Sequence, residues 1–489
     1  MKFNKWISVL ATTVLATSLT ITPVAKAENT KTIADESIYD LLVDRYFNGT
    51  DKNDLNVNAQ DPSQFAGGDF NGILQKLSLI KDMGFTIVSL GPVFATEKYD
   101  GTLTTSYSEF EPHFGTAEEF TNLVTTLKQK NMRVMIDFPL TNVSENHEWT
   151  QDPEKVDWIV GTSNGLVRWD LKNQEVQQAL INAIVEFVST YHVGGVRLTN
   201  LDIADAQFLN DMISAIKEVD ESIYIISDEE SDANFDATYF NDTNEIFRSI
   251  YINVDQDSSE QLKYIEPFVN GETKPTQIMF DNINTDRFIM DVEAYPPTRL
   301  KMAIASMLLL PGLPVMQYGT EIAMNGAVGP ESHQLYNFRT DEELVDFIEN
   351  IQMLKNSSDT LRGGEFKLLK NENGLLAFMR SSEDEKWIVV INNTSKTKRI
   401  DIPKDLVGEG KEIQAMLDSE VVRVNNENVY PLALDREVVE IYQVVDERGI
   451  NIPYLIALGF VYLIFISFIV ALMRRSKRNR KNETTENTN

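Results

Sequence analysis

The feature that most constrains the fold is a regular alternation between short apolar runs and longer amphipathic stretches, which extends from Ile38 to about Leu354. Short apolar runs separated by helix-length segments indicate successive βα units and therefore a parallel sheet. Eight such units in roughly 320 residues predict an α/β fold, a (β/α)8 TIM barrel, over residues 28–360. The clearest strand-like runs are Thr86–Leu90, Arg133–Asp137, Val196–Leu198, Ile223–Ile226 and Thr276–Phe280.

The pattern changes after Gly364, where apolar and polar residues begin to alternate, as in Gly374–Arg380 and Lys386–Asn392. This period of two is typical of antiparallel strands with one buried face. We expect a small C-terminal antiparallel β domain over residues 361–445, followed by a very short linker at 446–451.

Both ends of the chain carry an apolar segment next to basic residues. Lys2 and Lys5 precede an apolar run from Trp6 to Ile21, and Ala25-Lys26-Ala27 then supplies small residues. This is the arrangement of a secretory signal peptide, so residues 1–27 are predicted to be one.

The second apolar segment, Ile452–Met473, contains no charged residue over 22 positions. That length is enough for a helix to cross a bilayer. The tail, residues 474–489, begins with a cluster of basic residues that should stay cytoplasmic, which predicts a single-pass membrane anchor with the rest of the chain extracellular. A buried core helix is the alternative, but the segment lacks the polar face of one.

The charge of the chain excludes one class of partner. The formal net charge is -30 although both end segments are basic, so the part between them is strongly acidic. Such a surface repels nucleic acid, whereas a neutral glycan is indifferent to it. The chain has no cysteine, so a secreted form must rely on a large core rather than on disulfides.

Several phrases of the sequence resemble those of one enzyme family. From Ser37 to about Tyr442 the chain is similar to the α-amylase superfamily of glycoside hydrolases, which implies the same barrel and C-terminal domain. The phrases that carry the resemblance are Ile38–Arg45, Ala66–Ile73, Val88–Val93, Phe110–Thr116, Arg133–Asp137, Gly195–Asn200, Leu309–Val315 and Tyr318–Glu321. These are scaffold phrases, and fold alone does not imply activity.

The resemblance also implies where catalytic carboxylates should stand. The family uses an aspartate nucleophile, a glutamic acid and a third, stabilising carboxylate. The corresponding positions here hold Thr199, Asp228 and Asn284. A neutral hydroxyl without an adjacent base is a weak nucleophile, and Asp228 keeps only the charge. No catalytic position is therefore intact.

Supporting positions implied by the resemblance are substituted as well. Histidine positions hold Asn142, Ile203 and Ile283, and Thr141 replaces an asparagine. The aromatic platform for the sugar is replaced by Thr102. Asp137 and Arg197 persist, so the substrate-binding set that the resemblance implies is Asp137, Arg197, Asp228 and Thr102. The inserted segment after the third strand, about 143–167, is short for the family.

A shifted register does not restore the missing carboxylates. Asp202 lies three residues beyond Thr199, which is about 10 Å along an extended chain. Glu229 should face the opposite side of its strand from Asp228. Asp286 could replace Asn284 only by displacing the adjacent Arg-Phe pair.

The loop after the first strand contains oxygen ligands of the kind that Ca²⁺ requires. The family's secreted bacterial members often bind Ca²⁺ there, and the matching residues are Asn48, Asn53, Asp54 and Asp69. An ordinary polar turn is the alternative. A second family calcium site uses the positions of Thr141 and Ile203, so we expect its loss.

The remaining candidates are weaker. His113 and His147 are isolated, and the better interpretation is that they are satisfied structural residues. The acidic run 228–232 ends a strand and could be a site or a solvated loop. Tyr318 and Trp149 are candidates to line a cleft.

These observations leave two principal functions open. The first is a membrane-anchored pseudoenzyme that binds an α-glucan or other neutral glycan, or holds a protein partner in the membrane or cell wall. The second is an active α-glucan hydrolase or transglycosylase that uses a non-standard set such as Asp137, Asp228 and Glu229.

Overall fold

The computed structural model describes residues 31–201, 204–340, 342–449 and 452–486. The predicted signal peptide, 1–27, lies outside these residues, as do Asp202 and Ile203. Seven parallel strands form the central sheet, in the order β8-β7-β3-β2-β1-β10-β9. The strands are β1 (Ile38–Asp40), β2 (Ile87–Ser89), β3 (Arg133–Pro139), β7 (Gly195–Thr199), β8 (Tyr224–Ser227), β9 (Gln277–Ile278) and β10 (Leu313–Gln317).

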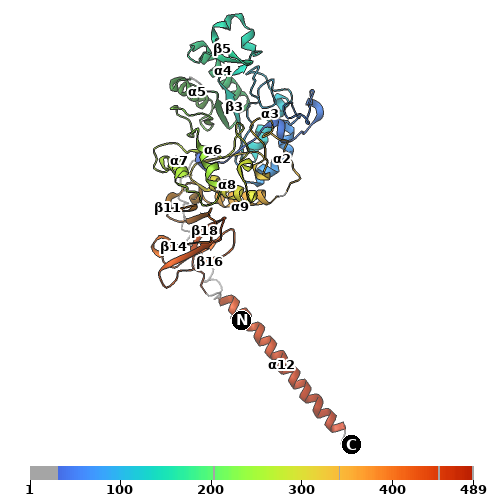
Figure 1. The fold of residues 1–489 in the computed structure, drawn as a ribbon. Helices are drawn as coiled ribbons and strands as arrows, with labels where there is room; N and C mark the ends of the chain where they lie inside the picture. Colours follow the sequence, from blue (N-terminus) through green and yellow to red (C-terminus); the bar gives the residue numbers. More distant parts are fainter. Residues whose placement is uncertain (1–30, 202–203, 341, 450–451, 487–489) are drawn as a thin grey trace, which may run out of the picture. The chain divides into compact units, whose positions relative to one another are not determined.

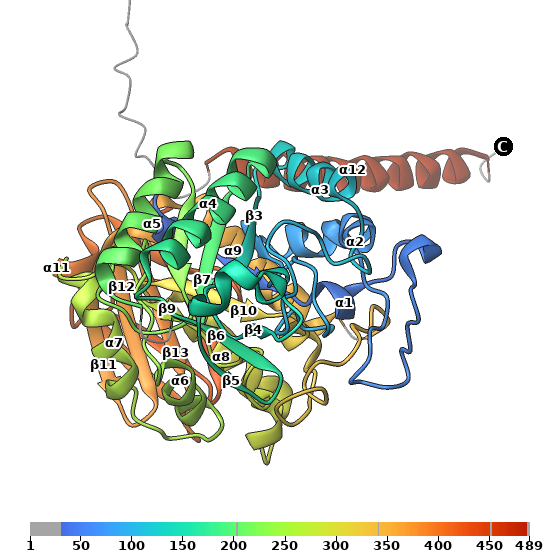
Figure 2. The same ribbon diagram turned by 90° about the horizontal axis from the view of Figure 1, so that it is seen from above.

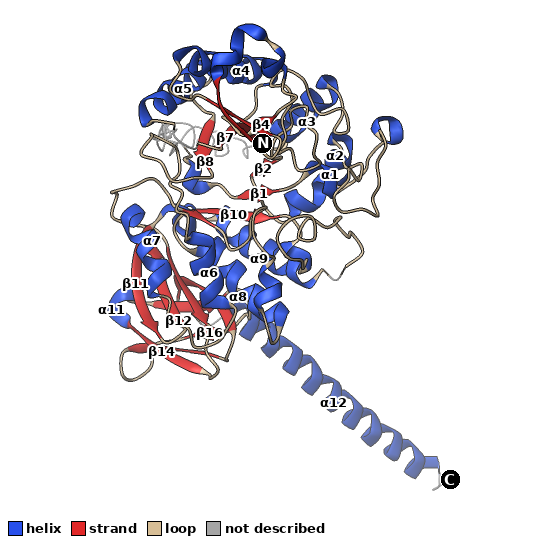
Figure 3. Ribbon diagram, turned by 45° about the horizontal axis from the view of Figure 1, so that its top comes forward, coloured by secondary structure: helices blue, strands red, loops and turns tan. Residues whose placement is uncertain are grey.

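An eighth extended segment, residues 236–239, closes this sheet between β8 and β9. The Asp236 amide donates to the Ile225 carbonyl at 2.8 Å, and on the other side the Gln277 amide donates to the Thr238 carbonyl at 2.9 Å. A short parallel bridge joins Thr238 to Thr276. The sheet is thus the (β/α)8 barrel that the sequence predicts (Figure 3).

Helices form the outer layer because each has one apolar stripe. In α3 the buried residues are Phe120, Leu123, Val124 and Leu127, a spacing that places them on one face. Thr116 begins this helix with a capping box to Glu119. The main barrel helices are α2 (Phe70–Asp82), α3 (Ala117–Gln129), α4 (Gln174–Tyr191), α5 (Ala206–Val219), α6 (Thr243–Tyr251), α7 (Ser259–Val269), α8 (Pro296–Leu309) and α9 (Glu343–Ser357). Short elements add α1 (Val43–Tyr46), α10 (Asp359–Gly363), η1 (Ile33–Asp35), η2 (Asp51–Asn53), η5 (Phe288–Asp291) and η6 (Thr320–Ile322).

One crossover has no helix. Only the loop 228–235 joins β8 to the strand at 236–239, whereas helices follow the other crossovers of the described barrel. The outer side of this strand is therefore less covered than that of its neighbours.

A small segment is inserted between β3 and α4 (Figure 2). It forms an antiparallel sheet in the order β4-β6-β5. Its elements are β4 (Val143–Ser144), η3 (Glu148–Gln151), η4 (Pro153–Trp158), β5 (Ile159–Ser163) and β6 (Leu166–Trp169).

The C-terminal domain is an antiparallel β structure with its own apolar core. A six-stranded sheet has the order β11-β12-β13-β18-β15-β16, and β14 pairs with β17. Arg299 of α8 joins the barrel to this domain through bonds to Asn393 and Glu437. The elements are β11 (Glu365–Glu372), β12 (Leu375–Ser381), β13 (Lys386–Asn392), β14 (Lys398–Pro403), α11 (Lys404–Val407), β15 (Lys411–Ala415), β16 (Val421–Val422), β17 (Val429–Leu434) and β18 (Val438–Asp446).

The last element is the long helix α12 (Ile452–Glu486), shown at the red end of the chain in Figure 1. Among the described residues it is the one helix long and apolar enough to cross a membrane, over Leu455–Ser476. Its apolar side chains there are exposed.

Candidate active site

The carboxyl ends of the barrel strands bring three charged side chains into one buried network. Arg197 of β7 is bidentate to Asp137 of β3, with Nε and Nη2 donating at 2.8 Å each. The same guanidinium donates to Asp40 of β1 at 2.9 and 3.1 Å. The pairing follows from sheet register, which places Asp137 directly beside Arg197.

Sequence reasoning identified Asp137 and Arg197 but missed Asp40. Its signal was a charged residue at the end of the apolar first strand, where the barrel interior opens. Burial alone would destabilise the charged guanidinium, but Asp137 and Asp40 hold the pKa of Arg197 well above its usual value. Burial raises the pKa of Asp137, and Arg197 opposes that shift. The network is a triad of buried ions. Removal of any one member would deprive a buried charge of a partner and would destabilise the fold.

Asp228, directly after β8, differs from the triad because it has no strong partner. Its Oδ1 is buried, and no hydrogen bond reaches that atom from any residue that the structure describes. Burial raises the pKa of Asp228 to about 7; Arg197 lowers it, whereas Asp137 and Glu229 raise it further. A carboxyl group with this pKa is about half protonated at neutral pH, so it can act as a proton donor.

Thr199 occupies the end of β7 and is buried. Its carbonyl accepts a hydrogen bond from the Leu140 amide at 2.9 Å, which holds the strand end beside β3. Within the described residues its hydroxyl bonds to no carboxylate or imidazole. No base among the described residues therefore activates the Thr199 hydroxyl.

Asn284 and Thr102 do not join this group by any hydrogen bond. Asn284 is exposed in a turn after β9, where its backbone N–H donates to Asn282 Oδ1 at 2.8 Å. Thr102 is exposed as well, and its hydroxyl donates to Asp100 Oδ1 at 2.7 Å. The structure thus links Asp137 and Arg197 directly, and Asp228 through charge, but leaves the other two in local turns.

The alternative carboxylates are already engaged. Glu229 Oε1 accepts from the Leu201 amide at 3.1 Å, which ties the loop after β8 to the loop after β7. Asp286 accepts from the Val328 amide and is exposed. Because both carboxylates already accept backbone hydrogen bonds, neither is free to replace the nucleophile.

The substituted supporting residues also serve the fold. Thr141 Oγ1 accepts from the Trp169 amide at 2.8 Å. Asn142 donates to Asn200 across the two loops at 3.2 Å, and both residues have positive φ values, 60° and 54°. Asparagine tolerates this conformation better than most residues, which explains its use here.

The calcium candidates form two groups. Asp69 caps α2 and accepts from the amides of Gly49, Thr50 and Gly72, so its oxygens already have donors. Asn48 donates to Asp54 at 2.9 and 3.1 Å.

One observation nevertheless suits a cation in this loop. Asn53 Oδ1 is buried without a partner within the described residues. Gly67 has a φ of +97°, and a Cβ there would lie 2.6 Å from Asn48 Nδ2 and 2.8 Å from Asp54 Oδ1, so glycine lets these two side chains pack against the backbone. The donor set is two carboxylates and two amides; across the described chain no group of three or more His, Cys, Asp or Glu side chains is arranged for a metal.

The isolated histidines are structural. His113 bonds to Glu111 and to the Leu55 carbonyl, and it stacks on Phe65 at 3.8 Å. His147 is fully buried, and burial lowers its pKa to about 3. The expectation that Tyr318 lines a cleft is wrong, because Tyr318 is fully buried and donates to the Gln334 carbonyl.

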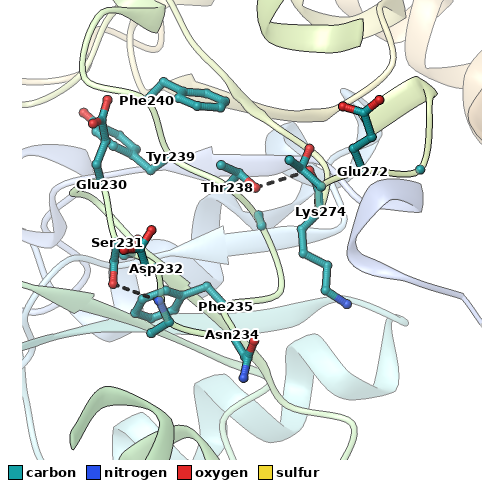
Figure 4. Close-up of a pocket in the computed structure, with 15 residues that line it drawn as sticks. Glu230, Ser231, Asp232, Asn234, Phe235, Thr238, Tyr239, Phe240, Glu272 and Lys274 are labelled. Carbon is teal, nitrogen blue, oxygen red and sulfur yellow. Dashed lines mark hydrogen bonds between the residues drawn. The ribbon is translucent and has the colours of Figure 1, made fainter. Parts of the chain in front are cut away.

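A large polar hollow lies beside the uncovered strand at 236–239 (Figure 4). Its volume is about 940 Å³, and it exists because the crossover from β8 has no helix. The acidic run of the sequence contributes Glu230 and Asp232 to its wall, and Lys274 lies opposite. Glu230 is engaged by the Asn241 amide at 2.9 Å, as expected for a solvated loop.

A barrel with acidic residues at its strand ends and a C-terminal β domain is compatible with the architecture of glycoside hydrolases. The family descriptions "Alpha amylase, catalytic domain" and "Alpha-amylase C-terminal domain" match residues 40–164 and 364–442. The chain belongs to the α-amylase superfamily.

Three similar proteins illustrate this membership. The crystal structure of an Anoxybacillus α-amylase superposes with a TM-score of 0.81 at 31% identity, covering 86% of this chain and 100% of that one. An α-amylase from Geobacillus thermoleovorans, complexed with acarbose, gives 0.79 at 29%, with the same coverage of 86% and 100%. A β/α-amylase from Paenibacillus polymyxa is 24% identical over 82% of this chain, which spans 37% of that protein's length.

Proposed function

We propose that the protein binds α-glucan at the carboxyl-end face of its barrel. The observation that carries the proposal is the Asp228 carboxyl beside the Arg197 triad, whose pKa of about 7 leaves it partly protonated and whose buried Oδ1 has no hydrogen-bond partner among the described residues. An unpaired buried polar group is costly, and a sugar hydroxyl would satisfy it. The similar α-amylase in complex with acarbose supports this ligand class.

We further propose that this face does not perform a retaining double displacement. That reaction needs two carboxyl groups about 5 to 5.5 Å apart, one of them the nucleophile. Thr199 stands where that nucleophile would be and has no base in contact among the described residues. On this proposal the protein is a pseudoenzyme that retains the fold and the sugar site.

A second candidate is an active α-glucan hydrolase or transglycosylase. The named relatives are amylases, and the pKa of about 7 at Asp228 suits a general acid. An active enzyme would also need a second, free carboxylate beside Asp228. Asp137 accepts two hydrogen bonds from Arg197, and Glu229 accepts one from the Leu201 amide.

One experiment separates these candidates. The full chain is incubated with starch, maltoheptaose and an activated α-glucoside, and binding is measured in parallel by calorimetry. Asp228→Asn is compared with Asp384→Asn, an exposed aspartate of the C-terminal domain. Turnover lost only in Asp228→Asn establishes the enzyme; binding without turnover establishes the pseudoenzyme; neither binding nor turnover overturns both.

The anchor is part of the proposal. Leu455–Ser476 is long, apolar and exposed, and the basic residues that follow it favour a cytoplasmic tail and an extracellular barrel. Protease treatment of intact cells should remove the barrel but leave the tail protected. Recovery of the full chain in the soluble fraction would refute the anchor. A stoichiometric membrane or cell-wall partner would appear in affinity purification from detergent extracts.

Calcium binding in the first loop is proposed on the basis of the buried Asn53 Oδ1, which has no partner among the described residues, and of the oxygen-rich side chains around it. Asn48, Asn53, Asp54 and Asp69 would hold the ion, which would stabilise the loop. Millimolar CaCl₂ should raise the unfolding temperature relative to EGTA, and Asp54→Asn should remove that difference while Asp384→Asn should not. Equal unfolding temperatures in CaCl₂ and EGTA would refute the site.

A further inference from the structure

A second hollow lies on the flank of the barrel, between α4 and the loops that carry Tyr107 and Trp149. Its volume is about 410 Å³. One wall is aromatic and the other is a polar stripe of a helix. The residues that matter are Tyr107, Glu148, Trp149, Asn182, Glu186 and Tyr191.

The aromatic wall is fixed by its own packing. The Trp149 ring lies 5.0 Å from Tyr107 and 5.3 Å from Trp158, and its backbone amide donates to His147 Nδ1 at 3.1 Å. Burial lowers the pKa of His147 to about 3, so its ring is neutral, and Nδ1 can accept this bond when the ring proton is on Nε2. Trp149 remains only partly buried, so it adds a rigid, partly accessible ring to the hollow.

The opposite wall is one stripe of α4. Asn182, Glu186 and Thr190 are spaced by four residues and are exposed. They span about 12 Å along the helix axis, since each residue rises 1.5 Å. Gln178 Nε2 donates to the side-chain Oδ1 of Asn182 at 2.9 Å. The side-chain NH₂ of Asn182 therefore remains available as a donor. Within the described residues the Glu186 carboxylate accepts no hydrogen bond.

The two walls together match one kind of ligand. A pyranose has an apolar face that packs on aromatic rings and a rim of hydroxyls that bonds to carboxylates and amides. Glu148 and Glu186 repel anions, and two separated carboxylates do not make a metal site. The hollow therefore suits a neutral sugar better than a charged metabolite.

We propose that this flank groove is a second α-glucan-binding site, distinct from the strand-end site; the ligand class rests on the proposed function. The Tyr107 hydroxyl donates to the carbonyl of Pro139, the last residue of β3, at 2.9 Å. This bond fixes the groove wall to β3, and β3 pairs with β7, the strand that ends at Thr199. A long glucan chain can engage both sites, which raises its affinity over that of a short one.

The test measures maltoheptaose and soluble amylose binding to the full chain by calorimetry. A polyoxyethylene detergent is used, because maltoside detergents would compete. The variant Asn182→Ala/Glu186→Ala removes the polar stripe, and Ser189→Ala, exposed on the same helix outside the groove, is the control. Asp228→Leu removes the hydrogen-bonding group of the strand-end site.

The expected result is two maltoheptaose sites in the natural protein. The α4 double variant should lose one site and weaken amylose binding about tenfold or more, with an unchanged unfolding temperature. Trp149→Phe, which keeps a ring, should weaken binding less than Trp149→Ala. A stoichiometry of one that only Asp228→Leu abolishes would overturn the groove and leave the proposed function standing. A stoichiometry of one that only the α4 variant abolishes would support the groove and overturn binding at the strand ends. No binding at all would overturn both.

Discussion

The retained and the substituted residues at the barrel's strand ends behave as two different regions. Asp40, Asp137 and Arg197 are buried and fully paired with each other. Asn284 and Thr102 are exposed, and each bonds within its own turn. The three paired charges form one buried network, and the two exposed residues take no part in it.

The physical basis is the cost of removing each group. A buried ion that loses its partner destabilises the folded state by several kcal/mol, so the triad can change only as a unit. A catalytic carboxylate acts mainly on the transition state, and its replacement leaves folding almost unchanged. Stability of the barrel therefore depends on the triad whether or not the protein hydrolyses a glycan.

The largest effect is expected at Arg197. Arg197→Met leaves the carboxylates of Asp40 and Asp137 buried and unpaired, and should lower the free energy of unfolding by about 3–5 kcal/mol. Urea denaturation followed by circular dichroism measures the change. Asn284→Ala is the matched control and should stay within about 0.5 kcal/mol. Equal losses of unfolding free energy for Arg197→Met and Asn284→Ala would contradict the difference between the buried triad and the exposed turns.

Asp228 should show an intermediate and pH-dependent effect. Its folded pKa of about 7 lies above the unfolded value of about 3.9, so the folded state binds the proton more tightly. The stability that this proton contributes is lost as pH rises from about 4 through 7. Asp228→Asn avoids that loss, so relative to the natural protein it should gain about 1–3 kcal/mol at pH 8 and little at pH 4. A difference that does not vary with pH would show that Asp228 is not protonated in the fold.

A smaller effect is expected at Thr199. Thr199→Val keeps the shape and removes a hydroxyl that has no carboxylate or imidazole partner in the described structure, so stability should change by less than about 1 kcal/mol. Maltoheptaose affinity should not change either. Calorimetry and thermal unfolding measure the two quantities. A loss of several kcal/mol would assign the hydroxyl a structural role.

The smallest effect is expected from restoring the family residues. Thr199→Asp with Asn284→Asp and Asp228→Glu should produce only trace turnover of an activated α-glucoside. Thr102 and Ile283 still replace an aromatic and a histidine, and Asn284 lies in an exposed turn. Turnover approaching that of a natural amylase would show that the three substitutions alone separate this barrel from an active one.

Much of the architecture could be predicted from local patterns. The rhythm of apolar runs predicted the barrel, which is confirmed, because each βα unit records its own period in the sequence. The change to alternating residues after Gly364 predicted antiparallel strands for the same reason. Asp137 and Arg197 were found through motifs, whereas Asp40 was missed because a three-residue strand carries little pattern.

The sequence by itself determined the elements and the family, since these depend on residue type and spacing along the chain. Only the tertiary structure decided which charges meet, because the Arg197 triad joins residues up to 157 positions apart. It also decided that burial raises the pKa of Asp228 to about 7 and that Trp149 lines a groove with the α4 stripe. Burial and contact are properties of the packed molecule, and no local pattern records them.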